Sequence, residues 1–245
     1  MTTNKLIVAL DVQTAPEALE LVEALRGAVG MFKVGMQLFT AAGPDLVRAI
    51  VRSGERVFLD LKYHDIPNTV AAAAVEATRL GVSMFNVHAT GGAEMMRSTA
   101  DAVLKTVDSE GLTQPIMLGV TILTSANALT LKDVGFRAEP AELVSRLAEL
   151  SDLSGMDGVV ASAREVGIVR SAVTRADFVV VTPGIRPAGS DSFDQKRVTT
   201  PRQALEAGAD YIVVGRPILE APDPAQAAQE ILAEMATTDA KGATI

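Results

Sequence analysis

Short apolar runs recur along the chain, and each is followed by a segment with helical periodicity. Eight runs have the length and apolar content of buried strands. They span residues 6–11, 31–36, 57–62, 84–89, 115–123, 158–162, 178–182 and 211–215. Apolar residues at helical spacing follow, and predict helices at residues 16–26, 44–53, 70–80, 94–107, 143–153, 164–173, from 201 onward and 224–235. The pattern is therefore one strand–helix unit repeated along the whole chain.

The repeat length indicates a barrel. Over 245 residues the units average roughly 31 residues, which is the period and total length of a (β/α)8 fold. A doubly wound sheet also alternates strand and helix, but its dinucleotide-binding form needs a Gly-rich turn after the first strand, and residues 12–16 contain no glycine. No Pro/Gly-rich linker divides the chain. We predict a single TIM-barrel domain over residues 1–245, with residues 236–245 a frayed tail and the active site at the C-terminal ends of the strands.

The third predicted strand carries charges in an apolar setting. Within residues 57–62, Asp60 and Lys62 share one face at period two. Asp65 follows in a turn, just before Pro67, where a helix is expected to begin. A solvated ion pair is the alternative, but Asp and Lys are rarely buried unless paired. Ionisable clusters in apolar surroundings concentrate at active sites, so this stretch predicts a catalytic charge cluster.

Other predicted strands also end in polar or small residues. Strand C-termini meet at one face of a barrel, so we expect these residues to converge. They are Asp11, Lys33, Asp60, Lys62, His88, Thr124, Thr182 and Gly215. We interpret His88 as a structural group beneath the site, with a general acid as the alternative.

Two late segments predict a site for an anion. Residues 182–187 and 213–218 follow the last two strands, where barrels often hold phosphate. Gly215 allows close approach of its backbone N–H, and Arg216 offers a planar guanidinium. The polar loop 188–199 between them has a length that could close over a ligand. The alternative is a flexible surface loop beside a structural arginine.

The composition argues against several kinds of binding partner and several kinds of site chemistry. The chain has 22 Lys+Arg against 30 Asp+Glu and a formal charge of -8, with no basic run, which argues against nucleic acid. It has no cysteine, which excludes disulfides, thiolate catalysis and Cys-based metal sites. No apolar run approaches the roughly 18 residues of a membrane span, and no signal-peptide layout precedes the first strand. We therefore expect a cytoplasmic protein without a membrane partner.

Residues 60–69, DLKYHDIPNT, resemble the signature of the orotidine 5'-phosphate decarboxylase family in its bacterial single-function form. Further motifs occur in the family's order: Ala9–Asp11, Lys33–Gly35, Val120–Ser125, Thr182–Arg186 and Val214–Arg216. The resemblance implies decarboxylation of orotidine 5'-phosphate to UMP, the last step of UMP synthesis, without a metal or organic cofactor. It also implies a homodimer of barrels with its active sites at the interface.

The same resemblance implies a role for each site residue. Lys62 would stabilise and protonate a carbanion at C6 of the substrate, and Asp60, Asp65 and Lys33 would complete the catalytic charges. Asp65, Ile66 and Thr69 would come from the partner subunit. Asp11 and Lys33 would hold the ribose, and Thr124 the pyrimidine amide edge. The implied substrate-binding residues are Asp11, Lys33, Asp60, Ile66, Thr69, Thr124, Arg186, Gln195, Gly215 and Arg216.

Two other functions are alternatives. Related barrels acting on sugar phosphates, of the 3-keto-L-gulonate 6-phosphate decarboxylase or hexulose phosphate synthase type, share an Asp-x-Lys-x-x-Asp pattern but use magnesium. Their second strand offers an acidic metal ligand where this chain has Lys33, which repels a cation, so no metal site is expected. A catalytically silent nucleotide-binding barrel belongs to another class, but every charged position that catalysis needs is present.

Overall fold

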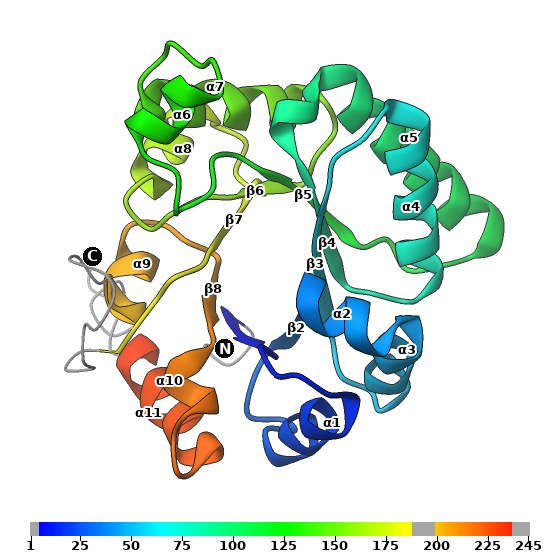
Figure 1. Cartoon of the computed structure of the whole chain (residues 1–245), viewed down its shortest axis with the longest axis vertical. Helices are drawn as coiled ribbons and strands as arrows, with labels where there is room; N and C mark the ends of the chain where they lie inside the picture. Colours follow the sequence, from blue (N-terminus) through cyan, green and yellow to red (C-terminus); the bar gives the residue numbers. More distant parts are fainter. Residues whose placement is uncertain (1–4, 188–198, 237–245) are drawn as a thin grey trace.

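The computed structural model describes residues 5–187 and 199–236. Its eight described strands are all parallel and close into a barrel in chain order, because the last strand pairs with the first (Figure 1). The strands are β1 (Leu6–Ala9), β2 (Met31–Gly35), β3 (Val57–Tyr63), β4 (Met84–His88), β5 (Ile116–Val120), β6 (Gly158–Val160), β7 (Val179–Thr182) and β8 (Tyr211–Val214). The predicted TIM barrel is confirmed.

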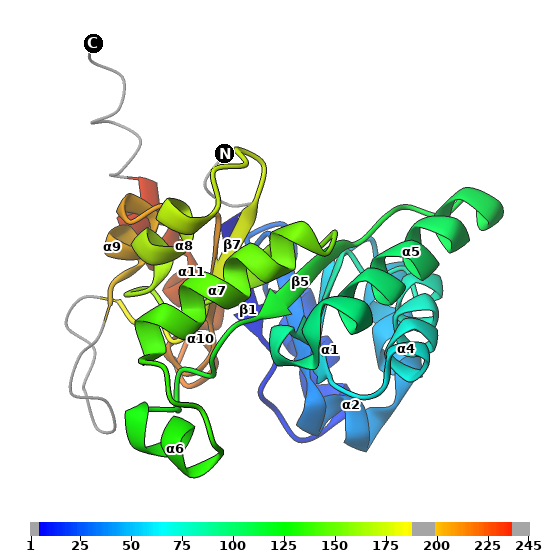
Figure 2. The same ribbon diagram turned by 90° about the horizontal axis from the view of Figure 1, so that it is seen from above.

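Helices surround the barrel in both views (Figures 1 and 2). They are α1 (Ala15–Ala24), α2 (Met36–Ala42), α3 (Pro44–Arg52), α4 (Pro67–Arg79), the 3-10 turn η2 (Ala89–Gly91), α5 (Gly92–Glu110), α6 (Ala128–Asp133), α7 (Pro140–Leu153), α8 (Val166–Ala172), α9 (Pro201–Glu206), α10 (Arg216–Leu219) and α11 (Pro224–Ala236). Among the residues described, no helix has the length and apolar composition needed to cross a membrane.

Local chemistry accounts for several helix boundaries. Thr14 caps α1 in a capping box with Glu17, and Pro67 begins α4, where its missing N–H costs no hydrogen bond. Three short helices were not predicted: α2, α6 and α10. No helix is predicted between the strand at 115–123 and the helix at 143–153, but α6 lies there, and Asn127 caps it by accepting from the Thr130 N–H at 3.0 Å. Such helices are too short to give a readable apolar period.

Helix α11 extends to the first residue of the predicted tail. Ala236 is the last residue of α11 rather than the start of a frayed tail. The remainder of that predicted tail, 237–245, lies outside the described residues, as does most of the predicted loop, 188–198.

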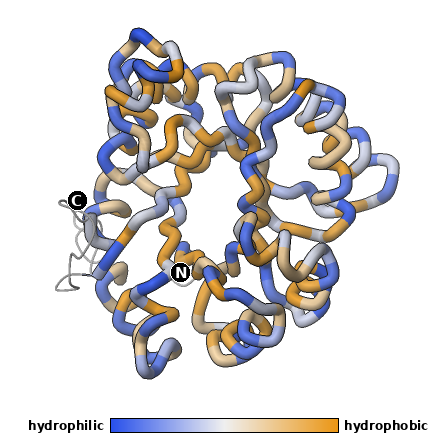
Figure 3. The backbone as a smooth tube through the Cα atoms, in the orientation of Figure 1, coloured by the Kyte–Doolittle hydropathy of each residue, from blue (hydrophilic) through white to orange (hydrophobic). Residues whose placement is uncertain are grey.

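Apolar side chains form two layers. The larger one lies between the strands and the helices, and hydrophobic colour follows the barrel wall in Figure 3. The smaller fills the barrel interior with Ile7, Ala9, Met31, Phe58, Met84, Leu118, Val181 and Val213. Phe58 is two residues before Asp60 on the same face of β3, so the apolar filling ends where the charged side chains begin.

Candidate active site

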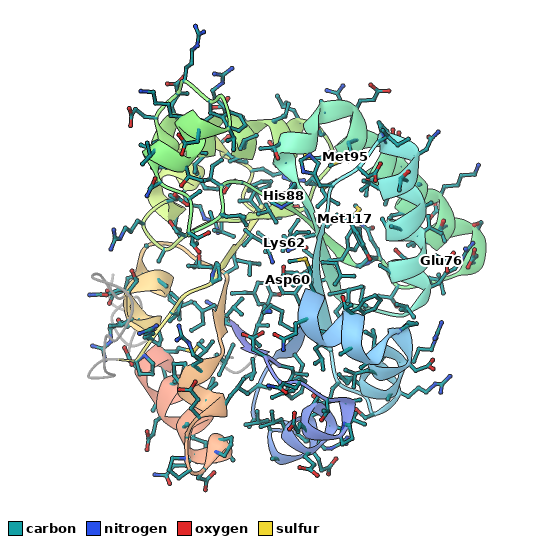
Figure 4. The ribbon with its side chains drawn as sticks, in the orientation of Figure 1. Asp60, Lys62, Glu76, His88, Met95 and Met117 are labelled. Atoms are coloured by element: carbon teal, nitrogen blue, oxygen red, sulfur yellow. The ribbon has the colours of Figure 1, made fainter. Side chains whose placement is uncertain are left out.

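Four charged side chains form an unbroken run of ion pairs at the C-terminal ends of β1, β2 and β3. Lys33 Nζ lies 3.4 Å from Asp11 Oδ1 and 3.3 Å from Asp60 Oδ2. Lys62 Nζ lies 2.6 Å from Asp60 Oδ1. Figure 4 shows Asp60 and Lys62 near the middle of the barrel. The charges alternate and sum to zero, which lowers the cost of burying them.

Asp60 is the centre of this run. The residue is 9 % exposed, and burial by itself favours its neutral form. The ammonium groups of Lys33 and Lys62, together with hydrogen bonds from Lys62 and Asn86, outweigh burial and hold the pKa of the Asp60 carboxyl below its usual value. Asp60 is therefore a carboxylate fixed between two cations.

The pairing of β3 with β4 is irregular at this point. The register shifts between the pairs Leu59–Phe85 and Tyr63–Val87. Residues 60–62 therefore lie opposite Asn86 alone, as in a bulge. Lys62 has a left-handed backbone with φ 51°, and its N–H donates to Asn86 Oδ1 at 2.8 Å. No sequence pattern indicates these contacts of Asn86, because it lies in an otherwise ordinary strand.

His88 ends β4 and is partly buried. Its ring centroid lies 5.3 Å from that of His64, on the loop after β3. Burial, followed by the nearby His64 and Lys62, lowers the pKa of His88 below its ordinary value, with Asp60 opposing. The neutral imidazole is therefore favoured. A structural role for His88 stays a prediction.

Two cavities meet at Lys33, Asp60 and Lys62. One has a volume of about 180 Å³ and mostly apolar walls. Besides those three residues, it is lined by Phe58, Val120, Ile122, Leu123, Thr124, Val160, Ala161, Pro183 and Val213. The other has a volume of about 200 Å³ and is lined by the same three residues with Leu10, Asp11, Val12, Gly35, Met36, Gln37 and Leu38. Thr124 thus lines one of these cavities and Asp11 the other, and the charged centre is common to both.

The predicted anion segments lie beside this centre. A Cβ placed on Gly215 would lie 3.2 Å from Asp11 Oδ2, so the end of β8 adjoins the start of the ion-pair run. The Arg186 N–H donates to the Thr199 carbonyl at 3.2 Å, which joins the two sides of the predicted loop. Arg216 is exposed at the start of α10. Gln195 lies outside the described residues.

Some predicted residues do not reach the cavities from within the chain. Asp65, Ile66 and Thr69 are exposed on the loop between β3 and α4 and at its first turn. Asp65 Oδ1 accepts from the N–H of Ile66 at 2.6 Å. Thr182 is fully buried, and its neighbour Pro183 lines the cavity instead.

Known proteins show the same fold and sequence pattern. A family model described as "Orotidine 5'-phosphate decarboxylase / HUMPS family" matches residues 4–231. The orotidine 5'-phosphate decarboxylase of Syntrophotalea carbinolica is 55% identical over 239 residues, covering 98% of each chain. That of Geobacter sulfurreducens is 53% identical over 232 residues, covering 95% of this chain and 96% of the relative. A crystal structure of the Lactobacillus acidophilus enzyme has a TM-score of 0.82 and 38% identity, covering 94% of this chain and 98% of that one.

Proposed function

This chain belongs to the orotidine 5'-phosphate decarboxylase / HUMPS family and decarboxylates orotidine 5'-phosphate to UMP, and we propose that Lys62 is the residue that makes this reaction possible. The observation that carries the proposal is the alternation Lys33–Asp60–Lys62 at the junction of the two cavities. In this arrangement the Lys62 ammonium can face a reacting carbon, while Asp60 and Lys33 hold it in place.

The chemistry needs such a cation. When the bond between C6 and the carboxylate breaks, CO₂ leaves and the electron pair stays on C6 as a carbanion that the ring does not delocalise. A fixed ammonium in a cavity with little water stabilises that developing charge. Lys62 then transfers a proton from Nζ to C6, which gives UMP. The neutral amine regains a proton from solvent before the next turnover.

Asp60 has two tasks in this mechanism. Its carboxylate, ionised between two lysines, orients the Lys62 ammonium through the 2.6 Å contact. It also faces the region that the substrate carboxylate occupies, and repulsion between the two carboxylates raises the energy of the bound substrate. That repulsion disappears as CO₂ leaves, so it favours the transition state over the ground state.

The remaining parts of the substrate bind to different parts of the site. The apolar cavity accommodates the flat pyrimidine, with Thr124 at its amide edge. Asp11 and Lys33, which pair at 3.4 Å, bind the ribose hydroxyls. Gly215, Arg216, Arg186 and Gln195 bind the 5'-phosphate, because a guanidinium and close backbone N–H groups match phosphate geometry. Binding energy from this remote group then supports the chemistry at C6.

The complete site is formed by two subunits. Asp65, Ile66 and Thr69 are exposed on the loop after β3 and the first turn of α4, and a large apolar side chain such as Ile66, 67% exposed, favours burial against a second copy. In this homodimer the partner's loop adds its Asp65 carboxylate beside Lys62. A two-fold arrangement gives two identical sites.

Metal dependence tests this mechanism against the magnesium-dependent relatives. Lys33 and Lys62 both contact the Asp60 carboxylate, and so occupy the position that a divalent cation would take. We expect purified protein in excess EDTA to consume orotidine 5'-phosphate. The loss of the substrate's absorbance measures this turnover. Lys62→Ala should lower kcat by roughly 10⁴-fold or more, whereas Lys105→Ala, an exposed lysine on α5, should match wild type. Turnover that requires added magnesium would contradict the proposal.

A further inference from the structure

Asn86 connects the two central catalytic groups from below the cavities. Met84, on the same strand, faces the barrel interior, so period two directs Asn86 to the same side. Asn86 is 0% exposed and lines neither cavity. Both ends of its amide are nevertheless used. Its oxygen accepts from the Lys62 N–H at 2.8 Å, and its nitrogen donates to Asp60 Oδ1 at 2.7 Å.

The first bond compensates for the bulge in β3. Residues 60–62 lie opposite a single residue of β4, so the Lys62 N–H cannot follow the regular ladder. A buried N–H needs an acceptor, and the Asn86 side chain supplies it. Lys62 also has φ 51°, a left-handed conformation that is strained for a non-glycine residue. The Asn86 bond holds that backbone, and with it the direction in which the lysine side chain leaves the strand.

The second bond sets the carboxylate plane. Asp60 Oδ1 accepts from both Lys62 Nζ and Asn86 Nδ2, which leaves Oδ2 directed to Lys33 at 3.3 Å. Asn86 is neutral, so it fixes this arrangement without adding a charge to the run.

We infer that Asn86 is a positioning residue for the decarboxylation, which holds the Asp60 carboxylate and the Lys62 backbone in their working geometry. The inference rests on the proposed roles of Asp60 and Lys62. Asn86 acts through these two groups and does not touch the substrate, so its loss should lower kcat and leave the KM for orotidine 5'-phosphate nearly unchanged.

The test uses two variants and one matched control. Asn86→Leu keeps the approximate volume and removes both hydrogen bonds. Asn86→Asp keeps the acceptor for the Lys62 N–H but replaces the donor to Asp60 by a second carboxylate. Thr99→Val is the control: Thr99 is equally buried, and its hydroxyl donates to the Met95 carbonyl within α5 at 2.8 Å. Each protein is assayed for kcat and KM across the acid-to-neutral range, after its folding is checked by circular dichroism.

We expect kcat to fall roughly 10- to 100-fold in Asn86→Leu, with a KM change below about threefold, because a hydrogen bond to a charged group is lost. The acid limb of kcat/KM should also move to higher pH in both Asn86 variants. Asp60 faces Lys33 from β2, Lys62 from β3 and His88 from β4, and without the amide donor it binds a proton more readily. Substrate titration is common to all the proteins and cancels in this comparison.

Thr99→Val should lose stability and keep the wild-type kcat and pH profile. A folded Asn86→Leu or Asn86→Asp with wild-type kcat and acid limb would overturn the inference, and if Asn86→Leu does not fold, Asn86→Asp decides. Lys62→Ala is assayed in parallel: if it stays active, the proposed mechanism fails, whereas an inactive Lys62→Ala beside fully active Asn86 variants rejects only the role of Asn86.

Discussion

Lys62 Nζ and Asp60 Oδ1 lie 2.6 Å apart at the junction of two cavities, and Lys33 approaches the other oxygen of the same carboxylate at 3.3 Å. One buried carboxylate thus pairs with two ammonium groups, and Asp11, 3.4 Å from Lys33, balances the remaining positive charge. Its position shows why the cluster is stable: each charge has a neighbour of opposite sign, and no ammonium faces another without Asp60 between them.

Asp60→Asn should therefore destabilise the fold as well as slow the reaction. The substitution keeps the shape but leaves two ammonium groups facing a neutral amide, so the free energy of unfolding should fall by about 3 kcal/mol. Urea unfolding at fixed protein concentration measures this. Asp45→Asn, which removes an exposed partner of Arg48, should unfold like wild type. An Asp60→Asn protein as stable as wild type would show that the two lysines do not depend on this carboxylate.

Arg216→Ala tests the phosphate assignment. If Arg216 binds the 5'-phosphate, its removal should lower kcat/KM for orotidine 5'-phosphate by roughly 100-fold. The same variant should treat orotidine, which lacks the phosphate, as wild type does. Arg202→Ala, exposed on α9, is the matched control. Equal losses with both substrates would mean that Arg216 acts on something other than the phosphate.

Mixing two inactive variants tests the shared site. In a dimer of one Lys62→Ala and one Asp65→Ala subunit, one site contains both substitutions and the other contains neither. When equal amounts of the two variants exchange subunits at random, about half of the dimers are mixed, and about a quarter of all sites should be intact. The measurement compares the decarboxylase activity of the mixture with that of each variant alone. If Lys62 and Asp65 of one chain served the same site, mixing would restore nothing.

His88 should make stability depend on mild acid. Its pKa lies below the ordinary 6.5 in the folded protein, chiefly because of burial, so the unfolded chain takes up the proton first. The stability that neutral His88 contributes is complete above 6.5 and is lost as the pH falls from 6.5 towards the lowered value. His88→Gln lacks this titration, so its urea midpoint should fall less than that of wild type over this interval. An equal fall of the urea midpoint in wild type and His88→Gln would contradict the prediction.

The sequence predicted the barrel well because its signal is repeated. Each buried strand is a compact apolar run, and the convergence of Asp11, Lys33, Asp60 and Lys62 follows from their places at strand ends. Asn86 was missed for the opposite reason. Its role depends on the shifted register between β3 and β4, and pairing between strands cannot be read from either strand alone.

Helix α6 was missed on similar grounds, because Asn127 and six following residues give a cap but no apolar period. Periodicity cannot indicate the substrate, and it cannot suggest that Asp65 comes from a partner subunit; both predictions rest on the family resemblance. Asp65, Ile66 and Thr69 are exposed in the single chain. A strand or helix pattern does not distinguish a loop that contributes to its own active site from one that contributes to a neighbouring subunit's site.

The exchange of the hydrogen at C6 of UMP tests most directly whether Lys62 is the proton donor. If the Lys62 ammonium protonates C6, the neutral Lys62 amine must remove that proton in the reverse step. Wild type in D₂O should therefore exchange the C6 hydrogen of UMP for deuterium, seen as loss of its proton NMR signal. Lys62→Ala should bind UMP and show no exchange above the protein-free rate, while Lys105→Ala exchanges like wild type. Exchange by Lys62→Ala at the wild-type rate would contradict the account, because another group would then be the proton donor.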